Sequence, residues 1–312
     1  MNTKLILIYF ILFSFIACNA KQDKQKSTEP IKTETAKVVK LSKTPLKENF
    51  KSYWYSGKAE LSSYNLKQSR YGEIRNGEVV LIFVTEPFSL SKQVKLDRPK
   101  DAGEDNVSVM KLNHVRKFNT GVYDYSIVTS TFTPIDFMNH PYTLKSTTSI
   151  QEWCGHTFTQ LNLDGNTYNF KQFSYFESDG DEEHKLEVAF LEEDLMTRIR
   201  INNGQLPGGE IDLIPSTISS RFTHKKMQVS KAIISKTELE NTINYTIKYT
   251  SIPRTLTIEV EHEFPYKIMG WTENDGDGLI TTAKLKASLQ EPYWNQKSIK
   301  DEAKRDELKL IK

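Results

Sequence analysis

The sequence predicts an all-β fold, a large antiparallel sheet that curls into a half-barrel or a sandwich. From Phe50 onward the chain is rich in Thr, Tyr, Phe, Ile and Val, the residue types that favour strands. Clusters of Asn, Asp and Gly recur at short intervals between the apolar runs, as they do at hairpin turns. Strands do not alternate regularly with helices in the pattern, which argues against a doubly wound α/β fold.

Four clusters of turn-forming residues separate the expected strands. Asn, Asp and Gly tolerate the positive φ that tight hairpin turns require. The clusters are Asn76-Gly77, Asp164-Gly165, Asp179-Gly180-Asp181 and Asn202-Asn203-Gly204. We therefore expect a hairpin turn at each of these places.

The runs between the turns alternate between apolar and polar residues. Residues 195–201 place Leu195, Thr197, Ile199 and Ile201 on one face and Met196, Arg198 and Arg200 on the other. Residues 245–249 and 256–261 alternate in the same way. A period of two predicts strands with one packed and one solvated face, so we expect a strand at residues 195–201. The segment from Pro292 onward is the one convincing helical stretch, and it predicts a short C-terminal helix on the surface.

The first residues predict a secretory signal that ends at a lipidated cysteine. Residues 5–17 are apolar or small and follow Lys4. The run is shorter than the roughly 20 residues of a spanning helix, and it fits the apolar region of a signal peptide. Phe15-Ile16-Ala17-Cys18 resembles a lipobox, with Phe where Leu is usual. We expect cleavage before Cys18 and acylation of that residue, which gives stable anchoring because more than one lipid chain is attached. A short uncleaved membrane anchor is the alternative.

The chain divides into three parts at this level. Residues 1–17 are the predicted signal peptide, residues 18–48 an acylated cysteine with a flexible basic tether, and residues 49–312 a single β-rich domain. Residues 19–48 contain eight lysines and four acids, a net charge of +4, and they lack a hydrophobic period. This composition predicts a disordered spacer, with contact to anionic headgroups as the alternative. The body lacks a basic stripe with interleaved aromatics, so we expect no nucleic-acid partner.

The sharpest local motif is Gln-Glu-Trp-Cys-Gly-His-Thr-Phe at residues 151–158. On a strand, Cys154 and His156 would share one face about 6.5–7 Å apart. A histidine there could stabilise a thiolate nucleophile, or the pair could bind a soft metal. Dithiol redox chemistry is excluded because Thr157 stands where a second cysteine would be needed. The common fate of a free cysteine is burial, and we expect Cys154 to be buried on a strand and slow to react.

Other motifs of catalysis or metal binding are weak. Residues 178–183 and 274–278 are acid-rich and could attract calcium, but neither matches an EF-hand, and we interpret both as hairpin turns. The sequence contains no zinc-type Cys/His array, no Gly-x-Ser-x-Gly elbow, no Walker loop and no dinucleotide fingerprint. We therefore predict neither a cofactor nor a metal.

Four segments resemble a group of uncharacterised bacterial lipoproteins. They begin at Tyr53 (Tyr-Trp-Tyr-Ser-Gly-Lys-Ala-Glu), Val84 (Val-Thr-Glu-Pro-Phe-Ser), Gln151 (Gln-Glu-Trp-Cys-Gly-His) and Leu206 (Leu-Pro-Gly-Gly-Glu-Ile-Asp-Leu-Ile-Pro-Ser). Members of this group often carry the label "septum formation inhibitor Maf". True Maf proteins are cytoplasmic nucleotide pyrophosphatases with an α/β fold and a Ser-x-Ser-Pro-Arg-Arg-type motif, which is absent here. The resemblance therefore implies an envelope lipoprotein and contributes no known activity.

Together these features predict an acyl-anchored lipoprotein of the bacterial cell envelope, held at the outer membrane by the lipid on Cys18. The expected role is non-enzymatic binding or assembly, with an unknown envelope ligand or protein as partner. Most of the many Tyr and Phe side chains should lie in the core, but a few could line a groove for a lipid, a peptide or a glycan. An envelope enzyme using Cys154 and His156 is the alternative, and a purely structural component is a third. A cleft holding both residues with an orienting acid would favour catalysis.

Overall fold

The structure is a computed structural model, and it describes residues 48–311. The predicted signal peptide, Cys18 and the tether up to residue 47 lie outside the described residues. The described residues belong to one of the two units of the chain, Ala36–Lys312.

The described chain is built on one fifteen-stranded sheet that does not close, which confirms the all-β prediction. The strand order is β8-β7-β6-β5-β4-β3-β2-β1-β15-β14-β13-β12-β11-β10-β9. All neighbouring strands are antiparallel except β9 and β10, which pair in parallel. The first half of the sheet consists of β1 (Ala59–Arg70), β2 (Glu73–Ser89), β3 (Asn106–Thr120), β4 (Tyr123–Pro134), β5 (Lys145–Glu152), β6 (Gly155–Asp164), β7 (Thr167–Ser174) and β8 (Glu182–Glu187). The second half consists of β9 (Phe190–Leu191), β10 (Gly209–Ile214), β11 (Ser230–Glu238), β12 (Thr242–Tyr249), β13 (Thr255–Glu261), β14 (Ile268–Asn274) and β15 (Thr281–Glu291).

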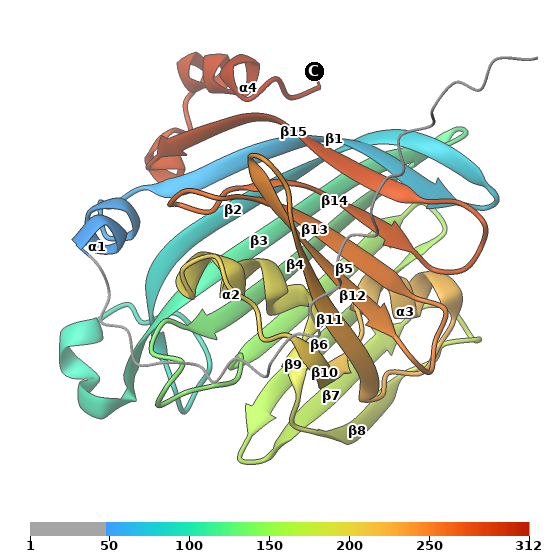
Figure 1. The fold of residues 1–312 in the computed structure, drawn as a ribbon, viewed down its shortest axis with the longest axis horizontal. Coiled ribbons are helices and arrows are strands. Elements are labelled where there is room, and N and C mark those ends of the chain that lie inside the picture. The colour runs from blue at the N-terminus through green and yellow to red at the C-terminus, as the bar shows by residue number, and fades with distance from the viewer. Residues whose placement is uncertain (1–47, 312) are drawn as a thin grey trace, which may run out of the picture. The chain divides into compact units, whose positions relative to one another are not determined.

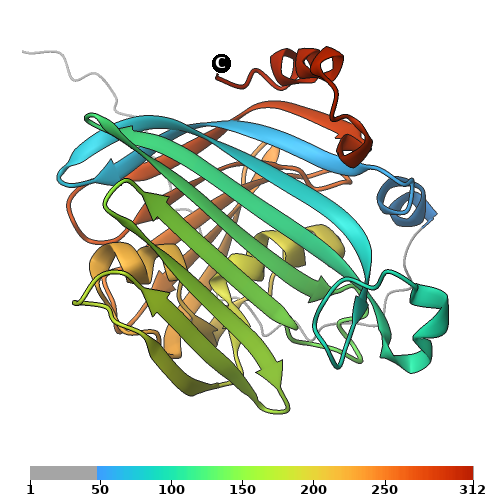
Figure 2. The same cartoon turned by 180° about the vertical axis from the view of Figure 1, so that it is seen from behind.

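The sheet curls so that its two halves face each other across short helices (Figures 1 and 2). The α-helices are α1 (Glu48–Trp54), α2 (Leu195–Ile201), α3 (Thr217–Thr223) and α4 (Ala303–Glu307). The described residues also form the 3-10 turns η1 (Pro99–Asp101), η2 (Gly103–Asp105), η3 (Glu192–Asp194), η4 (Tyr293–Asn295) and η5 (Ile299–Glu302). Both views place α2 and α3 between the halves. The short helix expected near the C-terminus is confirmed as η5 and α4.

Inward side chains of both halves and of α2 form one large apolar core. Leu81 of β2, Ile199 of α2 and Ile258 of β13 are fully buried in it. The rings of Tyr64 in β1 and Trp271 in β14 lie 4.9 Å apart between centroids. Full burial of a Leu or Ile side chain contributes about 1.5–3 kcal/mol to the free energy of unfolding. The core therefore holds the two halves of the sheet against helix α2.

Residues 195–201 form helix α2, so the prediction of a strand there is wrong. Every residue of α2 is buried, and a helix without a solvated face leaves no helical period in the sequence. The two arginines expected on a solvated face form ion pairs inside the protein. Arg198 Nε donates to Asp194 Oδ1 at 2.7 Å, and Arg200 Nη1 donates to Glu60 Oε1 at 2.8 Å. Tertiary burial therefore decides the conformation of a segment whose local pattern favours a strand.

Asn76-Gly77 lies inside β2, so the turn predicted there is wrong. The β1–β2 turn falls at Tyr71 and Gly72, which have φ values of 55° and 72°. Gly77 is required for another reason, because a Cβ at this position would lie 2.2 Å from the carbonyl oxygen of Lys117 in β3. The glycine lets the two strands approach closely.

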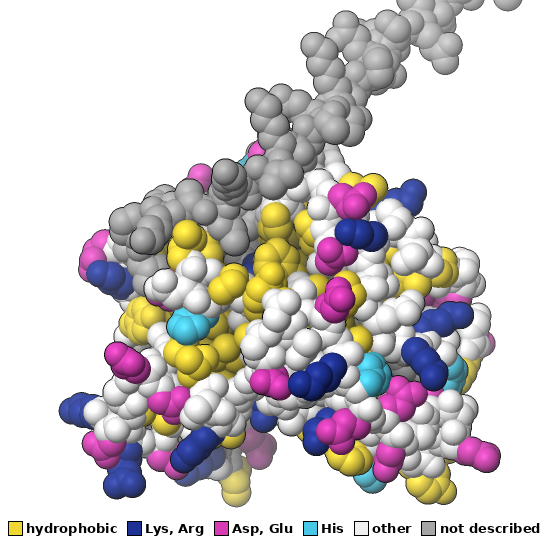
Figure 3. Space-filling model, turned by 90° about the horizontal axis from the view of Figure 1, so that it is seen from below, with side chains coloured by type: hydrophobic (Ala, Val, Ile, Leu, Met, Phe, Trp, Pro, Cys, Tyr) yellow, Lys and Arg dark blue, Asp and Glu magenta, His cyan; other side chains and the backbone are white. Residues whose placement is uncertain are grey.

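The other turn clusters lie at turns. Asp164-Gly165 connects β6 to β7, and Asp179-Gly180-Asp181 lies between β7 and β8, so both hairpin predictions are confirmed. Asn202-Asn203-Gly204 follows helix α2 instead of a strand. On the face of the molecule in Figure 3, acidic and basic side chains are interspersed and hydrophobic side chains gather near the middle.

Candidate functional site

Helix α3 is the centre of the candidate site, because cavities lie on three of its sides. Ser216 caps its first turn by accepting hydrogen bonds from the backbone of Ile218 and Ser219. His224 ends the helix in the left-handed conformation, with φ of 52°. Arg70 of β1 donates to the carbonyl of Phe222 at 3.2 Å and lies over its ring. These contacts fix α3 between the two halves of the sheet.

On the inner side of α3 lies a cluster of buried charged residues. Arg254 Nε donates to Glu192 Oε2 at 2.8 Å, and its Nη1 donates to Asp275. Arg116 Nη2 donates to Glu273 Oε1 at 2.5 Å. Both arginines are buried, and a buried charge is tolerated only when it is paired and hydrogen-bonded. Both arginines of the cluster are therefore paired, and they share three carboxylates between them.

A small inner cavity of about 40 Å³ lies within this cluster. It offers room for about one to three water molecules. Its lining residues are Leu112, His114, Arg116, Thr129, Glu192, Glu193, Met196, Ser216, Ile218, Arg254, Leu256, Trp271 and Glu273. His114 Nε2 is shielded from solvent and has no hydrogen-bond partner among the described residues. The inner cavity thus has apolar walls as well as charged groups at its margin, and it is too small for an organic ligand.

The surroundings shift the titration of three groups in this cluster. Burial and the neighbouring Glu192 carboxylate raise the pKa of Glu193 to about 7. Burial lowers the pKa of His114 to about 3, and Arg116 acts in the same direction. Burial alone would raise the pKa of Glu273, but the two arginines hold it at about 2. His114 is therefore neutral at physiological pH, while Glu193 lies near its midpoint.

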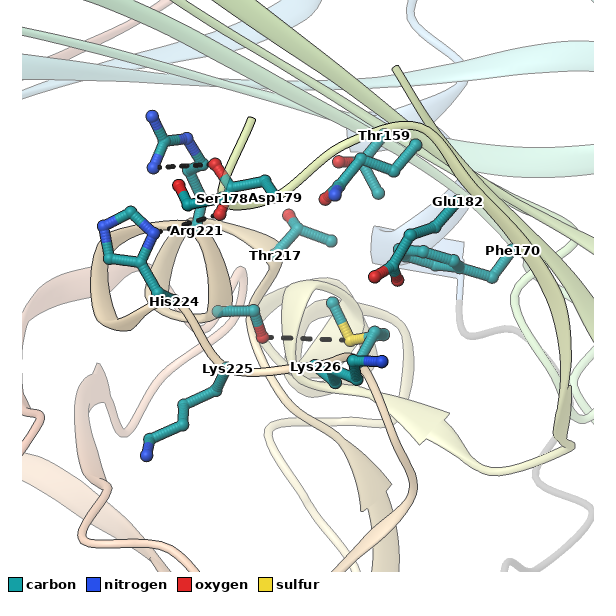
Figure 4. Close-up of a pocket in the computed structure, with 13 residues that line it drawn as sticks. Thr159, Phe170, Ser178, Asp179, Glu182, Thr217, Arg221, His224, Lys225 and Lys226 are labelled. Carbon is teal, nitrogen blue, oxygen red and sulfur yellow. Dashed lines mark hydrogen bonds and ion pairs between the residues drawn. The ribbon is translucent and has the colours of Figure 1, made fainter. Parts of the chain in front are cut away.

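Two larger cavities flank the outer end of α3. The first, which we call the Phe170 cavity, measures about 110 Å³ and has a mainly polar lining (Figure 4). Its lining residues are Thr159, Phe170, Gln172, Ser178, Asp179, Glu182, Thr217, Ser220, Arg221, His224, Lys225, Lys226 and Met227. Within it, Asp179 accepts from His224 Nδ1 at 3.0 Å and pairs with Arg221 at 3.1 Å. The charge of Arg221 at the end of α3 is therefore already paired.

The second, which we call the Ile252 cavity, measures about 140 Å³ and has a mainly apolar lining. Its lining residues are Pro215, Ser219, Ser220, Thr223, Lys225, Lys226, Gln228, Ser230, Ile252, Pro253, Arg254 and Asp275. Lys225 and Lys226 line both outer cavities, and no ion pair joins either lysine to another described residue. In Figure 4 the Lys225 side chain extends away from Phe170 and Glu182. The Ile252 cavity thus combines an apolar wall with unpaired positive charge.

Cys154 is exposed and lies in the turn between β5 and β6, so the prediction that it is buried on a strand is wrong. The short turn at residues 153–154 places the thiol at the tip of the hairpin, away from any core. The Glu152 carboxylate raises the pKa of the Cys154 thiol, which is the opposite of what activates a nucleophile. His156 is exposed on β6, and no hydrogen bond links it to Cys154 among the described residues. The structure brings the two residues to one hairpin, where both side chains are exposed.

The two acid-rich loops connect β7 to β8 and β14 to β15, as their interpretation as hairpin turns requires. Asp179 and Asp275 in these loops pair with Arg221 and Arg254. Within residues 48–311, no group of three or more His, Cys, Asp or Glu side chains could hold a metal ion. In the same range, no helix is long and apolar enough to cross a membrane.

The inner cluster was missed at the level of sequence, although β3 carries a signal for it. The inward positions of β3 run Leu112, His114, Arg116 and Phe118, so two polar residues occupy positions that the alternation reserves for apolar ones. A charged residue at such a position predicts a buried partner. The partners of Arg116, Gln68 and Glu273, lie 48 and 157 residues away in the chain, and no local pattern points to them.

Comparison with protein-family models, with curated proteins and with solved structures finds no match for this chain.

Proposed function

We propose that this protein is an acyl-anchored lipoprotein of the cell envelope with a non-enzymatic binding role. We further propose that its ligand is a small molecule with an apolar body and an anionic group. The apolar run of residues 5–17 and the lipobox-like Phe15-Ile16-Ala17-Cys18 support the anchor. The single observation that supports the ligand class is the Ile252 cavity, with its apolar wall and two unpaired lysines.

The size of the Ile252 cavity sets the size of the ligand. An apolar cavity of about 150 Å³ in a protein core is large enough for benzene. The Ile252 cavity measures about 140 Å³, so it fits one aromatic ring or a short alkyl chain. Ile252 and Pro253 from the β12–β13 connection and Pro215 before α3 supply apolar contacts for such a group.

The charges around this cavity favour an anion. Asp275 is ion-paired with Arg254, which also pairs with Glu192. Lys225 and Lys226 remain as cations without a partner among the described residues. A carboxylate on the ligand would give them a charge-assisted hydrogen bond. A strongly cationic ligand would find no unpaired acid on this wall.

Calorimetric titration with benzoate tests the ligand class, using the mature chain in phosphatidylcholine nanodiscs. We expect saturable binding of benzoate, weaker binding of benzyl alcohol and no saturable binding of acetate. The double change Lys225→Gln and Lys226→Gln should weaken benzoate binding about fivefold, as expected for partly exposed ion pairs. The matched control is Lys248→Gln, an exposed lysine on β12, which should leave the affinity unchanged.

Two results would contradict this ligand class. One is the absence of saturable benzoate binding, and the other is equal affinity in the double variant and the control. The anchor is tested separately by mass spectrometry of the N-terminal peptide, which should begin at an acylated Cys18. An intact Met1 or a free thiol at residue 18 would refute the anchor without bearing on the cavity.

A further inference from the structure

A cavity larger than the three around α3 lies on the outer face of the sheet. It measures about 440 Å³, and its walls come from β1, β15 and the C-terminal segment, residues 293–311. Figures 1 and 2 show α4 of this segment outside the curled sheet, on the other side of β1 and β15 from α2 and α3. We call this cavity the outer groove. It is separate in place from the Ile252 cavity, and about three times as large.

Outward side chains of two neighbouring strands form the floor of the outer groove. Leu61 of β1 lies directly opposite Leu289 of β15, and both line the groove. The preceding residue, Glu60, reaches Arg200 inside the curled sheet, so the alternation of the strand directs Leu61 outward. Leu61 is nevertheless only 8% exposed, because Leu308 of the C-terminal segment packs in the same hydrophobic cluster. The outer face of the sheet therefore carries a small core of its own.

The C-terminal segment is held at its two ends. At its start, Tyr293 packs against the hydrophobic cluster that contains Leu61. Near its end, Ser63 Oγ of β1 donates to the Leu308 carbonyl at 2.5 Å. Most of residues 294–302, between these two points, are exposed. The middle of the segment therefore borders the groove without filling it.

The outer groove has the size of a ligand pocket. Protein interiors are closely packed and contain few voids larger than a water molecule, whereas pockets for small ligands measure about 300–1,000 Å³. The groove falls within that range. Ile299 borders the groove and is 86% exposed, so this apolar side chain has room to pack against a ligand.

The lining of the groove favours an alkyl chain. An apolar cavity of about 150 Å³ holds benzene, which has six carbon atoms, so about 440 Å³ accommodates an alkyl chain of about 10–16 carbons. The aliphatic side chains that line the groove are Leu61, Leu289, Ile299, Leu308 and Leu310, and Tyr293 supplies the one aromatic ring of the lining. A flexible chain fits such walls better than a flat, fused ring system does.

The charges at the mouth of the groove favour an anionic group on that chain. Two of the acids that line it are already occupied, since Glu291 accepts from a lysine and a glutamine of the wall and Asp301 accepts from Ser298. Lys297 forms no ion pair with another described residue. The Arg305 guanidinium donates to a neutral carbonyl at 3.0 Å, which leaves its charge uncompensated. These two cations outnumber the one remaining acid of the lining, Glu302.

We propose that the outer groove binds a fatty acid. The alkyl chain lies between the floor made by Leu61 and Leu289 and the C-terminal segment, and the carboxylate forms charge-assisted hydrogen bonds with Lys297 and Arg305. Ile299 packs against the bound chain. The site shares no residue with the Ile252 cavity, so it stands or falls independently of the ligand proposed there.

Calorimetric titration with hexanoate, octanoate and decanoate tests this proposal, using the mature chain in phosphatidylcholine nanodiscs and protein-free nanodiscs to subtract partition into the bilayer. We expect saturable binding whose affinity rises about tenfold for every two added carbons, because each buried methylene group adds to the hydrophobic contribution. Decanol should bind more weakly than decanoate, since it carries no charge.

Variants of the groove locate the binding. Leu289→Trp fills the groove from its floor and should lower the decanoate affinity at least tenfold. The double change Lys297→Gln and Arg305→Gln leaves the apolar walls intact and should lower it about fivefold, as expected for partly exposed ion pairs. The matched control is Lys300→Gln, an exposed lysine of the same segment that does not line the groove and whose loss should have no effect.

Four results would overturn the proposal. The first is the absence of saturable decanoate binding, and the second is an affinity that does not rise with chain length. The third is a loss of decanoate binding in the Lys225→Gln and Lys226→Gln variant with none in Leu289→Trp, which would place the ligand in the Ile252 cavity. The fourth is binding by a Cys18→Ser chain but not by the acylated chain, which would show that the protein's own lipid occupies the groove.

Discussion

Glu193 accepts two hydrogen bonds from Thr217, the first residue of α3, one from the backbone N at 2.6 Å and one from the hydroxyl at 2.9 Å. This carboxyl group thus joins the inner charged cluster to the helix that separates the three cavities. Arg116 and Arg254 are committed to Glu192, Glu273 and Asp275, so Glu193 has no cation of its own among the described residues. Its titration therefore affects how firmly α3 is held.

The first prediction concerns the pH dependence of stability. The pKa of Glu193 is raised from 4.5 to about 7, so between these values the folded state binds a proton that the unfolded state has released. The contribution of Glu193 to the free energy of unfolding is therefore largest below pH 4.5. It decreases by on the order of 3 kcal/mol as the pH rises through 7. Glu193→Gln keeps the acceptor oxygen but cannot ionise.

Denaturant unfolding of both proteins from pH 5 to pH 8 measures this effect. The stability of Glu193→Gln relative to the unchanged protein should rise across that range. A constant difference would show that Glu193 does not titrate there. The control is Glu259→Gln, which changes an acid on the face of β13 opposite to the buried Ile258 and Val260.

The second prediction concerns the buried pair of Glu60 and Arg200. Both side chains are fully shielded, and Arg200 Nη2 donates to Glu60 Oε2 at 2.5 Å while Tyr53 donates to the same oxygen at 2.6 Å. Removing one partner leaves an uncompensated buried charge, so Arg200→Met should lower the free energy of unfolding by about 3–5 kcal/mol. The double change Glu60→Leu and Arg200→Met should recover much of this loss. Equal destabilisation by the single and the double change would contradict this account.

The strands were predictable where one face of the sheet is packed and the other is solvated. Residues 245–249 and 256–261 alternate because they meet the core on one side, and they form β12 and β13. The same pattern failed at α2 because no side of that helix meets solvent. In the sequence, Arg198 and Arg200 indicated a solvated face. Both are buried because Arg198 pairs with Asp194, one turn earlier, and Arg200 pairs with Glu60 of β1.

The candidate site was less predictable than the fold. The Ile252 cavity is formed by α3, the β12–β13 connection and the β14–β15 connection, which are separate in the sequence and meet only in the curled sheet. The polar residues His114 and Arg116 at inward positions of β3 were visible as exceptions to the alternation. Cys154 was placed wrongly because a free cysteine is commonly buried, whereas this one lies in a hairpin turn beside the exposed Trp153.

The third prediction follows from the close approach at Gly77. A Cβ there would lie 2.2 Å from the Lys117 carbonyl oxygen and 2.7 Å from Phe118 Cβ, and neither atom is at the end of a flexible side chain. Gly77→Ala should therefore separate β2 from β3 locally and lower the free energy of unfolding by about 1–3 kcal/mol. Asn76→Ala, at the neighbouring position of the same strand, is the control. If Gly77 served only as a turn residue, Asn76→Ala and Gly77→Ala would have similar effects.

The fourth prediction concerns the reactivity of Cys154. The thiol is exposed, so iodoacetamide should modify it completely in the folded protein without denaturant. The reaction at pH 7.5 should be slow for an exposed thiol, because the hydrogen bond and the negative charge of Glu152 raise its pKa and lower the thiolate fraction. Glu152→Gln removes that charge and should increase the alkylation rate. His156→Ala should leave the rate nearly unchanged, because no hydrogen bond joins His156 to Cys154 among the described residues. A rate that drops strongly in His156→Ala would instead show that the histidine activates the thiol, and the enzyme alternative would then become the better account of this hairpin.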